Sequence, residues 1–216
     1  ESSVTNNNCF YLSILISDIS TNSKSLDFKK IYKSESCSLS NNSIRIEKNE
    51  KKNSIFIATS ANFAHGLAPG EEELAQDDNS IYGKILEFNI QDRSMTTIAK
   101  GIRFPKSILL NDTGLIFSDG YNFNGDELNY LNLDDDSNKT YNYGWPEIEG
   151  PISNQNPPEN YVDPKLSYKH NEGYCAVIGG AFYSPKSSTF PEEWNDKYIF
   201  GDFCSGNIHL MNPESG

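Results

Sequence analysis

The sequence is short of positive charge. It contains 18 Lys and Arg residues against 30 Asp and Glu residues, a formal net charge of −12, and no run of basic residues. Contacts to a nucleic-acid backbone need clustered Lys and Arg, and attraction to an anionic membrane surface needs them as well. The composition therefore argues against nucleic acid and anionic membranes as partners.

Long apolar runs are also missing. No stretch approaches the ~18–20 apolar residues that a transmembrane helix requires, so no membrane span is predicted. Hydrophobic residues make up 36% of the chain, below the ~45–50% of a typical globular protein. Twelve Tyr, twelve Phe and two Trp nevertheless supply bulky groups, which predicts a small aromatic core under long polar loops rather than disorder.

The four cysteines, Cys9, Cys37, Cys175 and Cys204, include no close pair. Zinc sites favour cysteines about two to four residues apart, whereas the smallest separation here is 28. Disulfides are therefore the favoured interpretation, and four free thiols are the alternative. Of the three possible connectivities, Cys9–Cys37 with Cys175–Cys204 is the simplest.

Helical periodicity is nearly absent, since the longest candidate, residues 69–78, has too few apolar residues to bury a face. Short runs rich in Ile, Phe, Tyr and Leu recur instead, bounded by turn residues, which predicts an all-β sandwich, barrel or propeller. The predicted strands are residues 10–16, 43–46, 54–59, 83–88, 94–99, 115–118, 127–133, 177–183, 198–201 and 207–211.

A weak internal repeat favours the propeller. An Ile-Phe pair recurs at residues 55–56, 116–117 and 199–200, and these spacings suit blades of about 40–50 residues with insertions. Chance recurrence of a common dipeptide is the alternative. Since 216 residues supply four blades at most and the chain opens at Glu1 rather than Met, we expect residues 1–216 to be a partial β-propeller without a second domain.

Several motifs follow one another in an order that is typical of one family. They are AQDDNSIYGKIL at 75–86, GIRFP at 101–105, DG at 119–120, GDELN at 125–129, NYGWP at 142–146, EG at 149–150, CAVIGG at 175–180 and YIFGDFCSG at 198–206. Together they resemble the soluble PQQ-dependent sugar dehydrogenases, also called the glucose/sorbosone dehydrogenase family. The last two motifs also resemble its paired-cysteine, hedgehog-interacting-protein-like branch.

This resemblance implies a six-bladed β-propeller, of which the chain would cover about four blades, in a secreted or periplasmic protein. It implies PQQ- and Ca²⁺-dependent oxidation of an aldose or related sugar to the lactone, with electrons passing to an external acceptor. It also supports the Cys175–Cys204 pairing. Two alternatives remain open: a catalytically degenerate propeller that binds a carbohydrate or a protein, and a gene fragment that cannot close its propeller.

The resemblance also implies roles for individual residues. Glu127 and Tyr143 match the family's calcium ligands, and the main-chain carbonyl of Gly120 lies in the same loop, in keeping with the preference of Ca²⁺ for oxygen ligands. Arg103 matches the arginine that pairs with the cofactor's carboxylate or quinone oxygen, which suits a guanidinium. Phe104 stands where the family has Asn, so a ring that can stack on the quinone or fill space replaces an amide contact.

The general base is the largest departure from the family. Alignment on Arg45-Ile46 places Asn41 at the position of the family's histidine, and an amide cannot take the proton that sugar oxidation releases. His65, which follows a predicted strand, is the candidate substitute. His170 lies where the family often has a histidine near the cofactor rim, but surface roles are favoured for it and for His209.

Overall fold

The chain forms an all-β structure. The computed structural model describes residues 11–17, 25–35, 43–61, 72–120, 125–134, 139–152, 156–170 and 173–216. Within these ranges no helix is long and apolar enough to cross a membrane. The elements are β1 (Ser13–Ile16), β2 (Lys29–Lys33), β3 (Ile44–Asn49), β4 (Ser54–Thr59), the 3₁₀ turn η1 (Glu72–Ala75), β5 (Lys84–Asn89), β6 (Met95–Lys100), β7 (Pro105–Leu110), β8 (Gly114–Gly120), β9 (Gly125–Asn132), β10 (Tyr141–Asn142), β11 (Leu166–Lys169), β12 (Val177–Tyr183), the 3₁₀ turn η2 (Glu192–Trp194), β13 (Lys197–Asp202) and β14 (Ile208–Met211).

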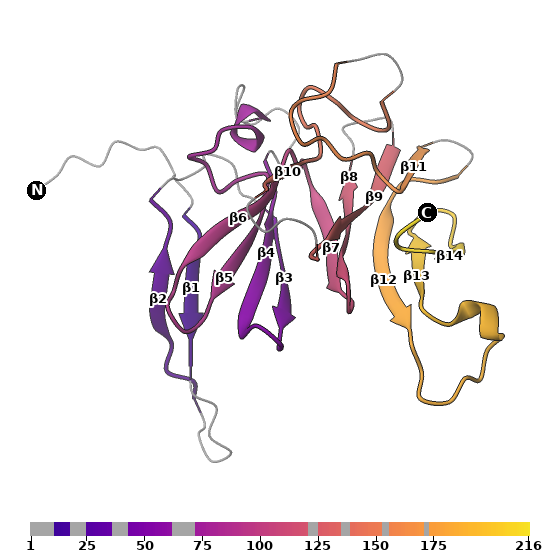
Figure 1. The fold of residues 1–216 in the computed structure, drawn as a ribbon, viewed down its shortest axis with the longest axis horizontal. Helices are drawn as coiled ribbons and strands as arrows, with labels where there is room; N and C mark the ends of the chain where they lie inside the picture. The colour runs from indigo at the N-terminus through magenta and orange to yellow at the C-terminus, as the bar shows by residue number, and fades with distance from the viewer. Residues whose placement is uncertain are drawn as a thin grey trace, which may run out of the picture.

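These strands form four sheets that stand side by side in a row (Figure 1). Their strand orders are β1-β2, β10-β6-β5-β4-β3, β11-β9-β8-β7 and β12-β13-β14. The first strands of the last three sheets are neighbours, because β7 contacts both β3 and β12. This is the arrangement of successive propeller blades, so the predicted all-β fold of the propeller type is confirmed.

All ten predicted strands are present, and residues 54–59 and 177–183 have the predicted bounds. The described residues contain four further strands, β2, β7, β10 and β11. Two lysines flank the apolar pair of β2, β7 begins with a proline, and β10 and β11 are short, so none of them shows a clear alternating pattern. The segment 69–78 is not an α-helix where it is described, and holds only η1.

The Ile-Phe repeat marks the second strand of three successive sheets. Phe56 lies on β4, Phe117 on β8 and Phe200 on β13, and each is at most 3% exposed. The register differs, however. Phe56 faces the following sheet, whereas Phe117 and Phe200 face the preceding one, because a shift of one residue along a strand turns a side chain to the other face.

Three apolar cores alternate with the four sheets, so the inner sheets are covered on both faces. β8 is buried at all of its residues because alternate side chains enter different cores. The first core contains Leu12, Ile57, Leu86 and Phe88, the second Phe56, Ile85, Ile108, Leu115, Phe117 and Tyr143, and the third Ile116, Leu128, Val177, Tyr198, Phe200 and Met211.

Polar side chains join the second sheet to the third. Arg45 of β3 donates from Nε to the carbonyl oxygen of Lys106 (2.7 Å), and Glu47 accepts a hydrogen bond from the backbone N–H of Leu110 (3.1 Å). The carbonyl group of Lys106 and the N–H group of Leu110 both belong to the backbone of β7. These bonds supply partners to backbone groups at the edge of a sheet, and they fix the two first strands relative to one another.

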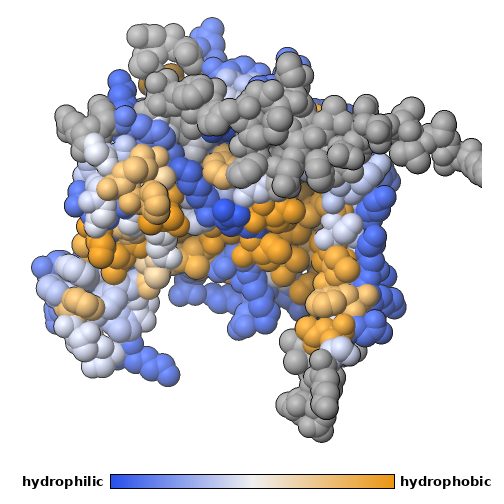
Figure 2. Space-filling view, turned by 180° about the vertical axis from the view of Figure 1, so that it is seen from behind, coloured by the Kyte–Doolittle hydropathy of each residue, from blue (hydrophilic) through white to orange (hydrophobic). Residues whose placement is uncertain are grey.

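Large apolar side chains remain exposed on edge strands and on the last sheet. Ile46 on β3, an edge strand of the second sheet, is 62% exposed, and Ile178 and Ile208 of the last sheet are 57% and 73% exposed. Figure 2 shows apolar groups gathered in a band across the back of the structure. The row of four sheets thus buries the faces between its members but leaves apolar area at its surface.

Gly83 provides a test of the packing around η1. Gly83 and Gly206 have nearly the same positive φ, 69° and 68°. A Cβ at Gly83 would lie 2.6 Å from the Cβ of Ala75 and 2.8 Å from that of Ala61, whereas one at Gly206 would meet nothing within 4 Å. We expect Gly206→Ala to cost only the left-handed penalty of about 1–2 kcal/mol.

Gly83→Ala should cost about 1–3 kcal/mol more than Gly206→Ala, because the alanines it meets cannot rotate away. Urea unfolding of both variants and the unchanged protein measures the difference. Equal losses in the two variants would contradict the close packing at Gly83.

Candidate functional site

Polar residues gather at one end of the sheets, the end at which β3, β7 and β12 begin (top of Figure 1). We call it the upper end. Because neighbouring strands are antiparallel, the starts of β5 and β9 and the ends of β4, β8, β11 and β13 lie there too. Segments distant in sequence therefore place their terminal side chains together.

Asp119, near the end of β8, holds the turn that leads into β7. Its Oδ2 accepts the backbone N–H of Arg103 (2.9 Å) and its Oδ1 that of Phe104 (2.5 Å). Burial raises the pKa of the Asp119 carboxyl to about 6, although the two hydrogen bonds favour the ionised form. The carboxylate thus fixes the backbone of the predicted cofactor-binding residues.

Arg103 is buried rather than directed at an open surface. It is 8% exposed, its Nη1 donates to the carbonyl oxygen of Gly120 (2.9 Å), and its guanidinium carbon lies 5.3 Å from the centre of the Trp145 ring. Burial lowers its pKa, and the charge of Asp119 opposes this shift. The Arg103 side chain is thus bound to the Gly120 backbone and packed near the Trp145 ring.

Three of the predicted cofactor and metal residues, Arg103, Glu127 and Tyr143, line one small cavity, whereas Phe104 and Gly120 do not. Its volume is about 10 Å³, enough for roughly one water molecule and far too small for a tricyclic quinone. The lining residues are Arg103, Asp119, Glu127, Tyr143, Trp145, Ile148 and Glu149. Residues from separate sequence motifs are therefore neighbours, but the space between them cannot admit the cofactor.

The side chains of Glu127 and Tyr143 do not fit a calcium ion in this geometry. Glu127 accepts the backbone N–H of Gly150 (2.7 Å) with one oxygen and the amide of Asn129 (2.9 Å) with the other. Tyr143 donates its hydroxyl to the carbonyl oxygen of Tyr130 (3.1 Å), and burial raises its pKa well above the usual value. No group of three or more His, Cys, Asp or Glu that could hold a metal occurs in the described ranges.

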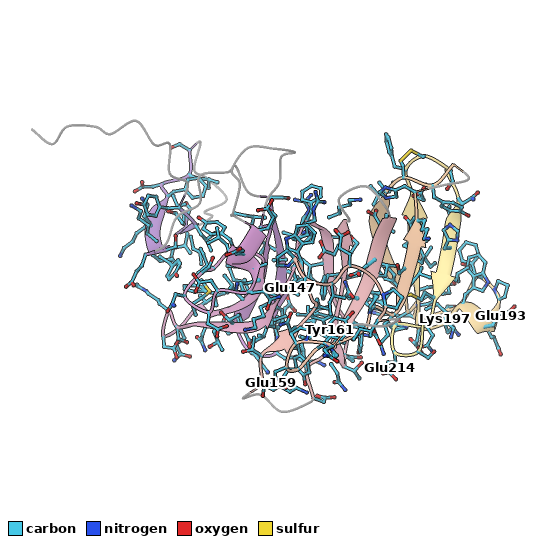
Figure 3. The ribbon with its side chains drawn as sticks, turned by 90° about the horizontal axis from the view of Figure 1, so that it is seen from above. Glu147, Glu159, Tyr161, Glu193, Lys197 and Glu214 are labelled. Atoms are coloured by element: carbon cyan, nitrogen blue, oxygen red, sulfur yellow. A yellow bond between two sulfur atoms is a disulfide. The ribbon has the colours of Figure 1, made fainter. Side chains whose placement is uncertain are left out.

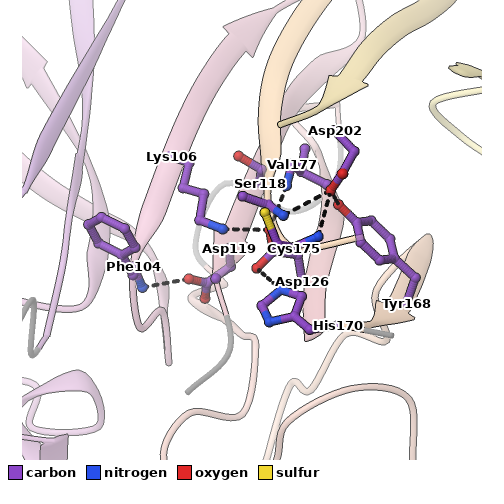
Figure 4. A network of polar contacts seen from close by, with 12 residues as sticks. Phe104, Lys106, Ser118, Asp119, Asp126, Tyr168, His170, Cys175, Val177 and Asp202 are labelled. Carbon is purple, nitrogen blue, oxygen red and sulfur yellow. Dashed lines mark hydrogen bonds and ion pairs between the residues drawn. The ribbon is translucent and has the colours of Figure 1, made fainter. Parts of the chain in front are cut away.

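Asp126 lies next to Glu127 on β9 but points to the other side of the sheet, where it forms a second cluster (Figure 4). Its Oδ2 accepts hydrogen bonds from Nζ of Lys106 (2.5 Å) and the backbone N–H of Val177 (2.6 Å). Nε2 of His170 lies 3.2 Å from its Oδ1. The Asp126 side chain is fully buried, while those of Lys106 and His170 are 17% and 22% exposed.

Sequence reasoning missed this cluster, because it favoured a surface role for His170. The available signal was the adjacent pair of acids, Asp126 and Glu127: neighbours on a strand point to opposite faces, so two buried environments need two sets of partners. Asn41 and His65, the candidates for the general base, lie outside the described residues.

Gly120 connects the two clusters. A Cβ on Gly120 would lie 2.9 Å from Cε of Lys106 and 3.3 Å from Cδ1 of Phe104. The absence of a side chain thus lets the Lys106 chain and the Phe104 ring pack over the backbone whose carbonyl oxygen binds Arg103. Of the side chains around Gly120, Arg103 is buried, whereas Phe104 and Lys106 are partly exposed.

Asp202, at the end of β13, organises the cysteine region. The predicted Cys175–Cys204 disulfide is present, with 5.5 Å between the Cα atoms, while Cys9 and Cys37 lie outside the described residues. Asp202 accepts five hydrogen bonds, from the backbone N–H groups of Cys175, Ala176, Cys204 and Ser205 and the hydroxyl group of Tyr168. The carboxylate therefore binds both ends of the disulfide.

Lys84, the first residue of β5, is fully buried. Its Nζ donates to the carbonyl oxygens of Leu74, Ala75 and Tyr82 (2.6–3.0 Å). Burial lowers its pKa to about 8. These bonds hold η1 against the second sheet, so Lys84 has a structural role.

An open groove of about 700 Å³ lies beside η1. It is acidic, and its lining residues are Glu73, Leu74, Gln76, Asp77, Pro146 and Glu147. Figure 3, seen from above, shows Glu147 and Tyr161 in the middle of the view. Tyr161 does not line the groove, and its hydroxyl group donates to the carbonyl oxygen of Gly150 (2.9 Å). Carboxylates accept hydrogen bonds from hydroxyl groups, so the groove suits a neutral polyol better than an anion.

The fold is similar to that of two solved structures of glucose dehydrogenases. One gives a TM-score of 0.65, covering 94% of this chain and 60% of that one, and the other 0.60, covering 91% and 63%. Identity is 19% in both, so the likeness shows a shared fold. The chain spans somewhat under two thirds of their length. No protein-family model and no curated protein matches the sequence.

Asp202 gives a prediction about acid stability. Burial raises the pKa of its carboxyl, but the hydrogen bonds from Ser205, Ala176, Tyr168 and Cys175 outweigh burial, and the net pKa is lowered. A lowered pKa contributes stability that is present above the unfolded-state value of about 3.9 and is lost as the pH falls from about 5 towards the folded-state value.

Asp202→Asn should therefore lower the free energy of unfolding at pH 7 by about 2–4 kcal/mol, because an amide cannot accept all of these bonds. The difference from the unchanged protein should shrink between pH 5 and pH 3. Urea unfolding at several pH values measures it, with the exposed Asp112→Asn as a control that changes stability little. A loss that is constant with pH would show that the Asp202 charge does not matter.

Proposed function

We propose that this chain is part of a propeller oxidoreductase that oxidises an aldose or related sugar to the lactone, with PQQ as the oxidant. The observation that carries the proposal is that residues of four separate motifs meet at the upper end: Arg103, Asp119 with Gly120, Glu127 and Tyr143. The likeness of the fold to glucose dehydrogenases supports it. The disulfide supports a secreted or periplasmic location.

Phe104 is the residue that would hold PQQ, because its ring offers a flat apolar face to a planar quinone. The Lys106 ammonium group lies beside this ring but is paired with the buried Asp126 carboxylate. When bound, PQQ supplies an acceptor for the hydride that leaves the sugar. Arg103 supports this surface from below, through its hydrogen bond to the Gly120 carbonyl oxygen.

The acidic groove beside η1 supports the choice of substrate class. Glu73, Asp77 and Glu147 present carboxylates to it, which accept hydrogen bonds from sugar hydroxyl groups. A calcium ion has no part in the proposal, because the oxygens of Glu127 and Tyr143 already have protein partners.

A propeller that binds a carbohydrate or a protein without catalysis is the second candidate. Two observations favour it: Arg103 is buried under Gly120 and Trp145, and Asn41 replaces the family's base. The two candidates differ in whether bound quinone is reduced when sugar is added.

We expect the complete protein to bind PQQ stoichiometrically and, with a suitable aldose, to reduce an artificial electron acceptor. Absorbance of the quinone measures binding, dye reduction measures turnover, and NMR identifies the lactone. A broad sugar panel that gives no dye reduction in the presence of PQQ would refute the oxidoreductase. A sugar bound without turnover would support the second candidate.

Phe104→Ala should weaken PQQ binding about 3- to 10-fold, since an aromatic stacking contact contributes about 0.5–1.5 kcal/mol. The matched control is Phe203→Ala, which truncates a phenylalanine that is 73% exposed after β13 and should leave PQQ affinity unchanged. Equal affinities for both variants would place the quinone away from Phe104.

A further inference from the structure

Three sequences of the form Asn-X-Ser/Thr, the acceptor pattern for N-linked glycans, begin at Asn41, Asn111 and Asn138. The pattern also arises by chance in a chain rich in asparagine, serine and threonine, so geometry has to distinguish a modified asparagine from an unmodified one. Asn41 and Asn138 lie outside the described residues, whereas Asn111 and Thr113 both lie within them. Asn111 is therefore the candidate whose surroundings can be assessed.

Asn111 holds the turn between β7 and β8 with its amide oxygen. Oδ1 accepts hydrogen bonds from the backbone N–H groups of Thr113 (3.0 Å) and Gly114 (2.7 Å) and from the hydroxyl group of Thr113 (3.3 Å). Asparagine stabilises turns in this way. Since a backbone N–H can only donate, the atom that faces the turn is the oxygen, and the amide nitrogen lies on the other side of the planar group.

The amide nitrogen of Asn111 is available for a bond to a sugar. Within the described part of the chain, Nδ2 of Asn111 forms no hydrogen bond. A glycan attached to Nδ2 leaves Oδ1 in place, so the hydrogen bonds that form the turn survive the modification. The Thr113 hydroxyl group, which the acceptor pattern requires, already lies beside the Asn111 amide.

The surroundings of this turn have room for a glycan. The turn lies at the end of the sheets opposite the upper end (Figure 1). Asn111 is half-buried, but it lines two cavities of about 650 and 370 Å³, and the neighbouring Asp112 side chain is 93% exposed. A glycan on Asn111 would therefore extend into solvent and leave the residues of the upper end uncovered.

We propose that Asn111 is an N-glycosylation site, an inference that rests on the proposed secreted location and not on the proposed oxidation. The donor is a lipid-linked oligosaccharide diphosphate of the secretory pathway. Nδ2 of Asn111 bonds to C1 of the first sugar and loses a proton, while the bond from C1 to the diphosphate oxygen breaks and the lipid diphosphate leaves with the electron pair. The Cys175–Cys204 disulfide fits passage through the same oxidising compartment.

Asn89 is the matched control. Its Oδ1 accepts the backbone N–H groups of Gln91 (2.8 Å) and Asp92 (3.3 Å) in the turn between β5 and β6, at the same end of the sheets. Asn89 is half-buried, like Asn111. It thus shares the turn geometry of Asn111 but has Gln91 where the acceptor pattern needs serine or threonine.

The first test is mass spectrometry of the protein isolated from its natural source. After digestion with a peptide N-glycosidase in H₂¹⁸O, we expect Asn111 to be converted to ¹⁸O-labelled aspartate and Asn89 to remain asparagine. Before digestion, the peptide that contains Asn111 should carry the mass of at least one N-acetylhexosamine. An unmodified Asn111 in this protein would overturn the inference.

A second test uses full-length variants produced in cells of the same source. Thr113→Ala should abolish the modification because the acceptor hydroxyl group is lost, whereas Thr113→Ser should retain it. Asn111→Asp is a second variant without a glycan, and its carboxylate oxygens can still accept the hydrogen bonds of the turn. A glycan that persists on Asn111 in Thr113→Ala would contradict the assignment.

The glycan is measured independently of sugar oxidation. An unmodified Asn111 in a protein that oxidises sugars would refute the glycosylation site alone. A glycosylated protein that oxidises no sugar would refute the proposed function and leave the glycosylation site in place.

Discussion

The structure depends on one constraint: each inner sheet must bury both of its faces. The second strand of each inner sheet satisfies this constraint, because its successive side chains point to opposite faces of the sheet. Ile116 and Phe117 on β8 enter different cores, as do Phe56 and Ile57 on β4. A sheet with two apolar faces needs a neighbour on each side, and this requirement places the sheets side by side in a row.

The same packing creates the site at the upper end. Where the strands end, backbone N–H groups no longer have carbonyl acceptors on a neighbouring strand. When these groups are buried, they need other hydrogen-bond acceptors. Three buried carboxylates supply them: Asp119 binds the turn before β7, Asp126 binds the start of β12, and Asp202 binds both sides of the disulfide. Acids that join one strand end to the next thus also concentrate charge where a ligand can approach.

In this arrangement, the buried residues that hold the backbone in place differ from the partly exposed residues that a ligand can reach. Arg103 lies inside, bound to the Gly120 carbonyl oxygen, while Phe104, Lys106 and His170 are partly exposed. The division follows from β9, on which Asp126 and Glu127 point to opposite faces. Glu127 lines the small cavity beside Arg103, and Asp126 brings Lys106 and His170 together.

The sequence by itself determined the all-β class, ten of the strands in the described residues and the Ile-Phe repeat, because these depend on local alternation, and motif order supported the Cys175–Cys204 pairing. Only the tertiary structure decided which faces the charged residues occupy. Arg103 and Glu127 line the same cavity, but it has room for only about one water molecule. The partnership of His170 with Asp126 joins residues 44 positions apart, and no local pattern records a contact that arises from the pairing of β11 with β9.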